Sequence, residues 1–134
     1  MITFDDFRLF LHVLAATVWV GGQIVLAGLV PTVRTFGDDA TRKVARAYNR
    51  IAWPAFGLIV FTGMWNLMQL SMDNITIPQG LFGVKMVFVL LSGAGALVHQ
   101  MARGNKAMLA VGGAFASVFA ALALLWGVAL GQLV

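Results

Sequence analysis

Long apolar stretches, separated by short polar segments, run through nearly the whole chain. Each stretch has about 20 residues or more, which is the length an α-helix needs to cross a hydrocarbon core roughly 30 Å thick. The pattern predicts an all-α fold: an integral membrane four-helix bundle that forms a single transmembrane domain over residues 1–134. The predicted helices cover about 7–31, 40–72 with a kink near Pro54, 80–102 and 107–134.

Composition narrows the class of protein further. Hydrophobic residues make up 60% of the 134 residues and charged residues 10%, which is typical of a membrane protein. The chain has no cysteine, so any metal site would depend on His, Met, carboxylate or backbone ligands. The net charge of +4 comes from basic residues that flank the apolar spans. We therefore expect a bilayer with anionic headgroups as the partner, and no nucleic acid.

Basic residues collect in two of the three connections between the predicted helices. They are Arg34, Arg42, Lys43, Arg46 and Arg50 in and directly after the first connection, and Arg103 and Lys106 in the third. Because short basic loops stay in the cytoplasm, both chain ends are expected on the outer side. We expect a multi-pass protein of a bacterial plasma membrane.

The first predicted helix carries a histidine, His12, within the segment LHVLAATVWVGG. A side chain that can carry charge is costly inside a bilayer, so we expect His12 to have a partner or a role. Trp19 follows seven residues later on the same helical face, and small residues such as Gly22 leave space there for a flat group. His12 is therefore the leading candidate for a ligand-binding residue.

Three methionines, Met64, Met68 and Met72, follow one face of the second predicted helix at four-residue spacing. Thioethers suit Cu(I) or an axial position on haem, although methionines at this spacing also serve as packing. At 1.5 Å per residue, His12, Met64, Met68 and Lys85 lie roughly 6–12 Å from the outer helix ends. We therefore expect three helices to contribute polar or thioether groups at one depth.

Other polar groups in the spans each allow two interpretations. Lys85 would offer a cation to a porphyrin propionate or another anion, or would extend its ammonium group to the lipid headgroups. Thr62 and Asn66, four residues apart, would bind a quinone or form a hydrogen bond with a neighbouring helix; the second role is favoured.

His99 is the second of the two histidines in the sequence. It is expected about 20 Å from His12 along the membrane normal, so one haem cannot be bound by both. His99 therefore belongs to a second metal site, or it has a structural role with a hydrogen bond to a backbone carbonyl or Tyr48.

Small residues form a heptad-spaced seam along the fourth predicted helix. They are Gly113, Ala116, Ala120, Ala123 and Gly127. Such a seam permits close backbone approach, either within the bundle or across a homodimer.

Three segments resemble the CopD-like copper-resistance membrane domain and related small four-helix proteins. The first is LHVLAATVWVGG, the second NRIAWPAFGLIVFTGMWNL and the third VKMVFVLLSGAGALV. The resemblance spans three of the four predicted helices, and it implies copper handling with His12, Trp19 and Lys85 at matching positions.

A more distant resemblance links the chain to the HemJ-type protoporphyrinogen oxidases, which bind b-type haem. The shared features are the spacing of His12 and Trp19, an early proline in the second helix, and a lysine that opens the third. After its tryptophan this chain reads VGGQIVLAGLVP, without the arginine of the HemJ pattern. The resemblance therefore implies haem binding at His12 and not protoporphyrinogen oxidation.

These observations support three hypotheses. The first is b-type haem in the outer half of the bundle, as in a membrane cytochrome b, for electron transfer with a membrane redox partner or for small-molecule redox chemistry. Its cofactor-binding residues would be His12, Trp19, Met64, Met68 and Lys85. The second is copper binding and transport. The candidate metal ligands are His12, Met64, Met68, Met72 and His99. The third is a non-catalytic subunit that docks to a larger membrane complex.

Overall fold

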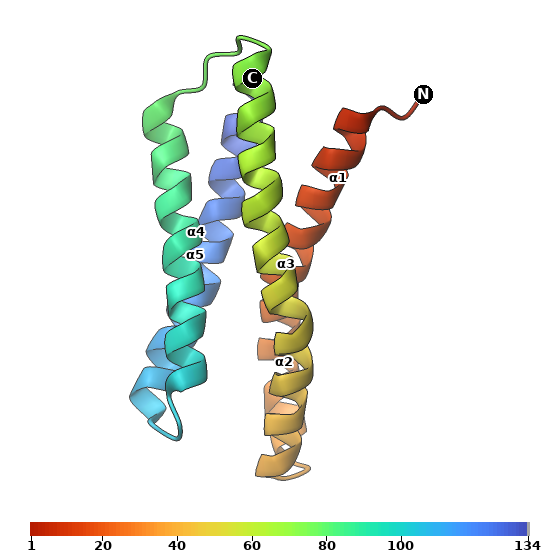
Figure 1. The fold of residues 1–134 in the computed structure, drawn as a ribbon. Helices are drawn as coiled ribbons and strands as arrows, with labels where there is room; N and C mark the ends of the chain where they lie inside the picture. Colours follow the sequence, from red (N-terminus) through yellow and green to blue (C-terminus); the bar gives the residue numbers. More distant parts are fainter. Residues whose placement is uncertain (134) are drawn as a thin grey trace. The chain divides into compact units, whose positions relative to one another are not determined.

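The computed structural model describes residues 1–133, and every regular element in that range is helical (Figure 1). The elements are α1 (Phe4–Ala16), the π-helix η1 (Thr17–Gly21), α2 (Gly22–Arg34), α3 (Asp38–Met72), α4 (Gln79–Met101) and α5 (Lys106–Gly131). Four helical stretches within residues 1–133 are long and apolar enough to cross a membrane, with α1, η1 and α2 forming one of them. The prediction of an all-α chain with four such stretches is confirmed.

The first helical stretch is longer than its apolar pattern predicts at both ends. The Thr3 hydroxyl accepts a hydrogen bond from the backbone N–H of Asp6, and the Asp6 carboxylate accepts one from the backbone N–H of Thr3. This reciprocal cap satisfies free N–H groups, and α1 therefore begins at Phe4 instead of near Phe7. At the other end, α2 continues through Pro31 as far as Arg34.

A five-residue π-helical segment, η1, interrupts the stretch that the sequence predicts as one regular α-helix. Such segments are rare and occur often at functional sites. Trp19 of η1 is buried, and its ring packs 5.5 Å from that of Trp53 and 4.6 Å from that of Phe56, between ring centroids. The hydroxyl of Tyr48 donates a hydrogen bond to the carbonyl oxygen of Trp19 at 3.4 Å. Contacts from α3 therefore support the irregular turn.

The chain divides into two compact units. The first unit, Met1–Gln69, holds α1, η1, α2 and nearly all of α3, and within it α1 leans away from α3 toward the N-terminus (Figure 1). The second unit begins at Leu70 and is dominated by α4 and α5, which run side by side as an antiparallel hairpin (Figure 1).

The backbones of α4 and α5 approach each other closely. A Cβ atom added to Gly95 would lie 2.6 Å from the backbone nitrogen of Ala116, and one added to Gly112 would lie 2.5 Å from that of His99. The Ser92 hydroxyl donates a buried hydrogen bond of 2.7 Å to the Ala116 carbonyl oxygen. The buried residues of α5 are Gly112, Ala116, Ala120, Ala123 and Leu130. Three alanines of the predicted seam are therefore buried in this helix, and Ala116 lies against α4 in the same chain.

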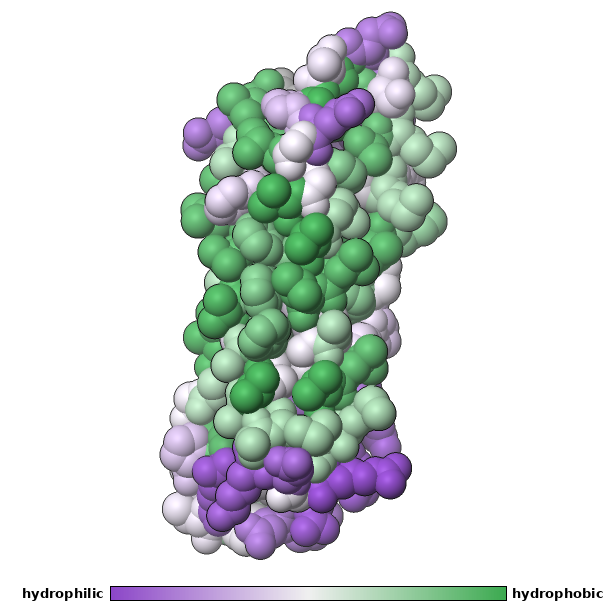
Figure 2. Space-filling model, turned by 90° about the vertical axis from the view of Figure 1, so that its left-hand side faces the viewer, coloured by the Kyte–Doolittle hydropathy of each residue, from purple (hydrophilic) through white to green (hydrophobic). Residues whose placement is uncertain are grey.

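Large apolar side chains are exposed on every long helix. In Figure 2, hydrophobic side chains cover the middle of the face in view, and hydrophilic side chains gather toward its ends. Soluble monomers rarely expose contiguous apolar surface on this scale. The exposed surface and the four apolar stretches are consistent with a multi-pass membrane protein.

Candidate functional site

The imidazole of His12 contacts α3 through a short chain of hydrogen bonds. Its Nδ1 atom lies 2.7 Å from the Oγ1 atom of Thr62, and that hydroxyl lies 2.6 Å from the carbonyl oxygen of Leu58. Thr62 has no exposed surface, so its hydroxyl must form its hydrogen bonds inside the protein. The favoured interpretation of Thr62, a hydrogen bond with a neighbouring helix, is the one that the structure contains.

This chain of contacts determines which nitrogen of the His12 ring carries a proton. A carbonyl oxygen only accepts, so the single hydroxyl hydrogen of Thr62 is donated to Leu58. The hydrogen in the contact between His12 and Thr62 must then come from Nδ1 of the ring. In the neutral imidazole, Nε2 consequently carries the lone pair, which is the form that binds a metal. Metal-binding histidines are commonly oriented by a hydrogen bond from their other ring nitrogen.

The His12 ring lies beside Gly63 of α3. A Cβ atom added to Gly63 would lie 3.4 Å from the Cε1 atom of His12 and 4.0 Å from its Nδ1 atom. The Nδ1–Cε1 edge of the ring therefore lies against the side of α3 that carries Thr62 and Gly63. Sequence reasoning singled out His12 and Thr62 separately but did not pair them, because they are 50 residues apart.

The space that Gly22 leaves beside α2 is already filled by a side chain of α3. A Cβ atom added to Gly22 would lie 2.6 Å from the Cε2 atom of Tyr48, so the tyrosine ring rests on the glycine. Trp19, the other aromatic candidate, packs into the cluster with Trp53 and Phe56. These contacts give Trp19, Gly22 and Tyr48 roles in packing α3 against η1 and α2.

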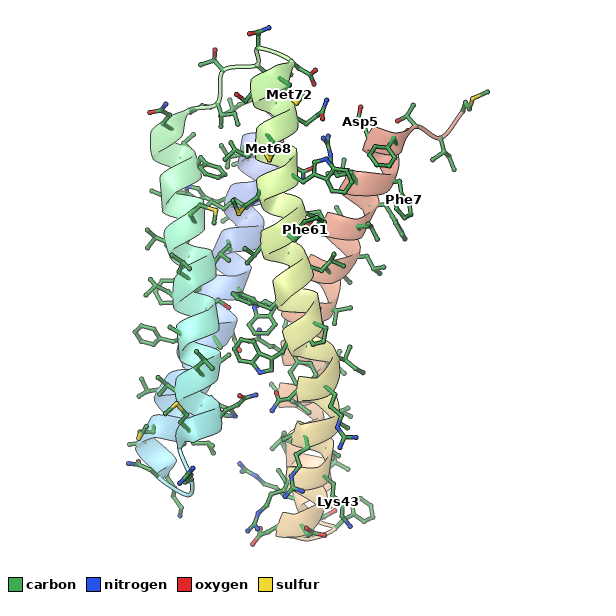
Figure 3. The ribbon with its side chains drawn as sticks, in the orientation of Figure 1. Asp5, Phe7, Lys43, Phe61, Met68 and Met72 are labelled. Atoms are coloured by element: carbon green, nitrogen blue, oxygen red, sulfur yellow. The ribbon has the colours of Figure 1, made fainter. Side chains whose placement is uncertain are left out.

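Met64 and Met68 lie in an apolar groove of about 370 Å³ together with Phe61 and Trp65. Their exposed fractions are 60% and 63%. At 100° per residue, Met64 and Met68 point 160° and 120° away from Thr62 around the helix axis. Phe61, Met68 and Met72 follow one side of α3 (Figure 3). The methionine ladder therefore exists, but on a different side of α3 from the residue that holds His12.

Lys85 lies in the second unit, where its side chain passes over Gly127. A Cβ atom added to Gly127 would lie 3.0 Å from the Nζ atom of Lys85. The ring of the neighbouring Trp126 packs edge-on against Phe88, with centroids 5.3 Å apart, and its buried Nε1 atom has no hydrogen-bond partner among the described residues. Lys85 therefore reaches across from α4 to α5.

His99 forms a hydrogen bond from Nδ1 to the carbonyl oxygen of Leu109 at 2.7 Å. A Cβ atom added to Gly113 would lie 3.0 Å from the same nitrogen, so the ring rests on the start of α5. The sequence allows two roles for His99, a metal ligand or a structural residue with a hydrogen bond to a backbone carbonyl. The structure contains that hydrogen bond. The hydroxyl of Tyr48, the other proposed partner of His99, is directed to Trp19 instead.

Within residues 1–133, no group of three or more His, Cys, Asp or Glu side chains could hold a metal ion. A bare ion would need such a set of protein ligands. A porphyrin supplies four nitrogen ligands itself and requires only one or two from the protein. A single oriented histidine could serve as such a ligand.

No protein-family model, curated protein or solved structure matches the chain. The chemistry of the His12 site is therefore the basis for a functional assignment.

Proposed function

We propose that the protein is an integral membrane haem protein in which His12 is an axial ligand of b-type haem. The single observation that carries the proposal is the chain of hydrogen bonds from His12 through Thr62 to Leu58. It assigns the proton to Nδ1 and the lone pair to Nε2, and it fixes the ring inside an apolar span. Bound haem would supply one-electron redox chemistry or binding of a small molecule.

The chain's own residues divide the work of holding such a group. Thr62 orients the His12 ring, which lies beside Gly63 on the same side of α3. Met64 and Met68 lie on another side of α3, so the proposal gives them no axial role. The resemblance to the HemJ-type proteins supports haem at His12, and the resemblance of residues 11–22 to the CopD-like proteins supports His12 as a metal ligand; membership of that group is part of the proposal.

The proposal includes an orientation in a bacterial plasma membrane. The turns between α2 and α3 and between α4 and α5 are flanked by basic residues, which favour the cytoplasmic side and anionic headgroups. Both chain ends would then lie on the outer side. Because the chain has no cysteine, single cysteines introduced at Gly37 and Asn74 would report the side directly. A membrane-impermeant maleimide should label intact spheroplasts at position 74 and not at position 37.

The absorption spectrum tests the function. The full chain is produced with a haem supply, purified in mild detergent, and measured oxidised and dithionite-reduced, with iron and copper analysis of the same sample. The wild type should show a Soret band, reducible α and β bands and stoichiometric iron. His12→Ala should lose these bands and the iron, because the Nε2 lone pair of His12 is the proposed iron ligand. His99→Ala is the matched control and should retain them.

Other outcomes would point to the alternative functions. A colourless protein that carries copper, lost in His12→Ala and in Met64→Leu, would support copper binding. A folded protein without either metal would support a docking subunit. Full haem content in His12→Ala would contradict the proposed ligand directly.

A further inference from the structure

Arg8 lies on the same side of α1 as His12, one helical turn closer to the N-terminus. Two neighbours on this stripe contact α3: the ring of Phe4 lies 5.3 Å from that of Trp65, and His12 meets Thr62. Arg8 lies between Phe4 and His12 at four-residue spacing, so it belongs to the α3-facing stripe. Its side chain is only 11% exposed.

The guanidinium of Arg8 has more hydrogen-bond donors than the described residues satisfy. Its Nη2 atom lies 3.3 Å from the Oδ1 atom of Asp5, whose side chain is 64% exposed. The Nε and Nη1 atoms are buried and have no hydrogen-bond partner within the part of the chain that the structure describes. An arginine stays protonated at any physiological pH, so burial cannot be relieved by loss of the proton.

A buried cation of this kind is costly unless an acceptor completes its hydrogen bonds. Asp5 supplies one long contact from an exposed position, and contacts of that kind stabilise little. The planar fork of a guanidinium matches carboxylate and phosphate oxygens. The unsatisfied donors therefore call for an anionic oxygen group beside the first helix.

We infer that Arg8 binds a propionate carboxylate of the haem that His12 holds, an inference that rests on the proposed function. One helical turn, about 6 Å, separates the two residues along α1. The carboxylates of a porphyrin extend from one edge of the macrocycle, so a macrocycle held at His12 would offer its anionic edge to a guanidinium on the same side of α1. Arg8 thereby recognises the ionised carboxylates of the unesterified porphyrin, here called the free acid, and directs that edge toward the N-terminal end of α1.

The test compares haemin with its dimethyl ester, which keeps the iron and loses both negative charges. Both are titrated into purified full-length protein in one detergent, and the Soret change gives each Kd. Arg8→Gln should weaken free-acid binding roughly 10- to 100-fold relative to the wild type, as expected for charged hydrogen bonds, and leave ester binding nearly unchanged. Arg8→Lys keeps the positive charge without the planar fork, so its affinity for the free acid should lie between those of the wild type and Arg8→Gln.

Controls separate recognition from folding. Arg42→Gln makes the same chemical change at an exposed position on α3 and should leave both Kd values unchanged. Ester binding is the internal reference. A misfolded Arg8→Gln would lose binding of both haemin and the ester, and in that case the measurement on Arg8→Lys decides whether the inference holds. If Arg8→Lys distinguishes acid from ester as strongly as the wild type does, a fork contact is excluded and the inference is wrong.

Two further results would overturn the inference in different ways. If the wild type and Arg8→Gln bind haemin with equal affinity, and binding still depends on His12, the assignment of Arg8 to a propionate is wrong and the proposed function stands. If neither ligand binds the wild type, the proposed function fails and the inference with it. Loss of copurified anionic phospholipid in Arg8→Gln, with an unchanged ratio of acid to ester affinity, would assign Arg8 to a lipid phosphate instead.

Discussion

The two compact units pack their helices in opposite ways. In the second unit, α4 and α5 touch through backbone atoms, because glycines and alanines line their contact. In the first unit, side chains fill the space between helices: Trp19 against Trp53 and Phe56, Tyr48 over Gly22, and His12 against Thr62. Across the described residues, extensive close approach of sequence-distant helices occurs only between α4 and α5.

The difference indicates where a ligand can be held. A seam of small residues brings two helices so close that only backbone and methyl groups fit between them, which suits a rigid scaffold. Helices held apart by large side chains can place polar groups between them. The oriented histidine, the buried guanidinium and the π-helical turn all occur in the first unit.

The largest effect is expected where the backbones touch. In Gly95→Ala the new methyl group would lie 2.6 Å from a backbone nitrogen and 2.9 Å from the carbonyl oxygen of Gly112. Neither atom can move without separating the helices, so we expect a loss of about 3 kcal/mol in the free energy of unfolding. Gly83→Ala is the control in α4, because its methyl group would meet nothing within 4 Å. Detergent titration followed by circular dichroism measures both; equal stability would refute the close contact.

A smaller effect is expected at Thr62, where the first unit depends on a side chain. Thr62→Val keeps the shape but leaves the Nδ1–H group of His12 without this acceptor. We expect a loss of about 1–2 kcal/mol in stability and a roughly 10-fold weaker affinity for haem. Thr62→Ser keeps the hydroxyl and should retain most of the affinity, as measured by haemin titration. Unchanged affinity in Thr62→Val would show that the hydroxyl does not orient the ring.

The smallest effect is expected for Tyr48→Phe. The substitution removes a 3.4 Å hydrogen bond to Trp19 and keeps the ring that fills the space over Gly22. Hydrogen bonds inside membrane proteins contribute on average about 0.6 kcal/mol, and this one is long. Unfolding in the same detergent series should therefore show a loss near that value. A loss as large as that of Gly95→Ala would show that the hydroxyl, and not the ring, supports η1.

The sequence predicts the four apolar helices well, because length and hydropathy are local properties. It also singles out His12, since an ionisable group inside an apolar span is conspicuous. It does not pair His12 with Thr62, nor does it predict η1, because both depend on which residues of α3 face the first helix. Arg8 is missed for the same reason. Near the end of a span it looks like an interfacial residue, and its burial is visible only in the folded chain.

The hydroxyl of Thr62 would influence the reduction potential of an iron bound at His12. Many metal-binding histidines donate their second N–H to a carboxylate, which draws the proton away and makes the ring a stronger electron donor. Here the acceptor is a neutral hydroxyl whose own hydrogen is committed to the Leu58 carbonyl. The His12 ring is therefore only a modest donor, and an iron held by it would have a higher reduction potential than one whose histidine faces a carboxylate. Thr62→Asp would convert the one case into the other.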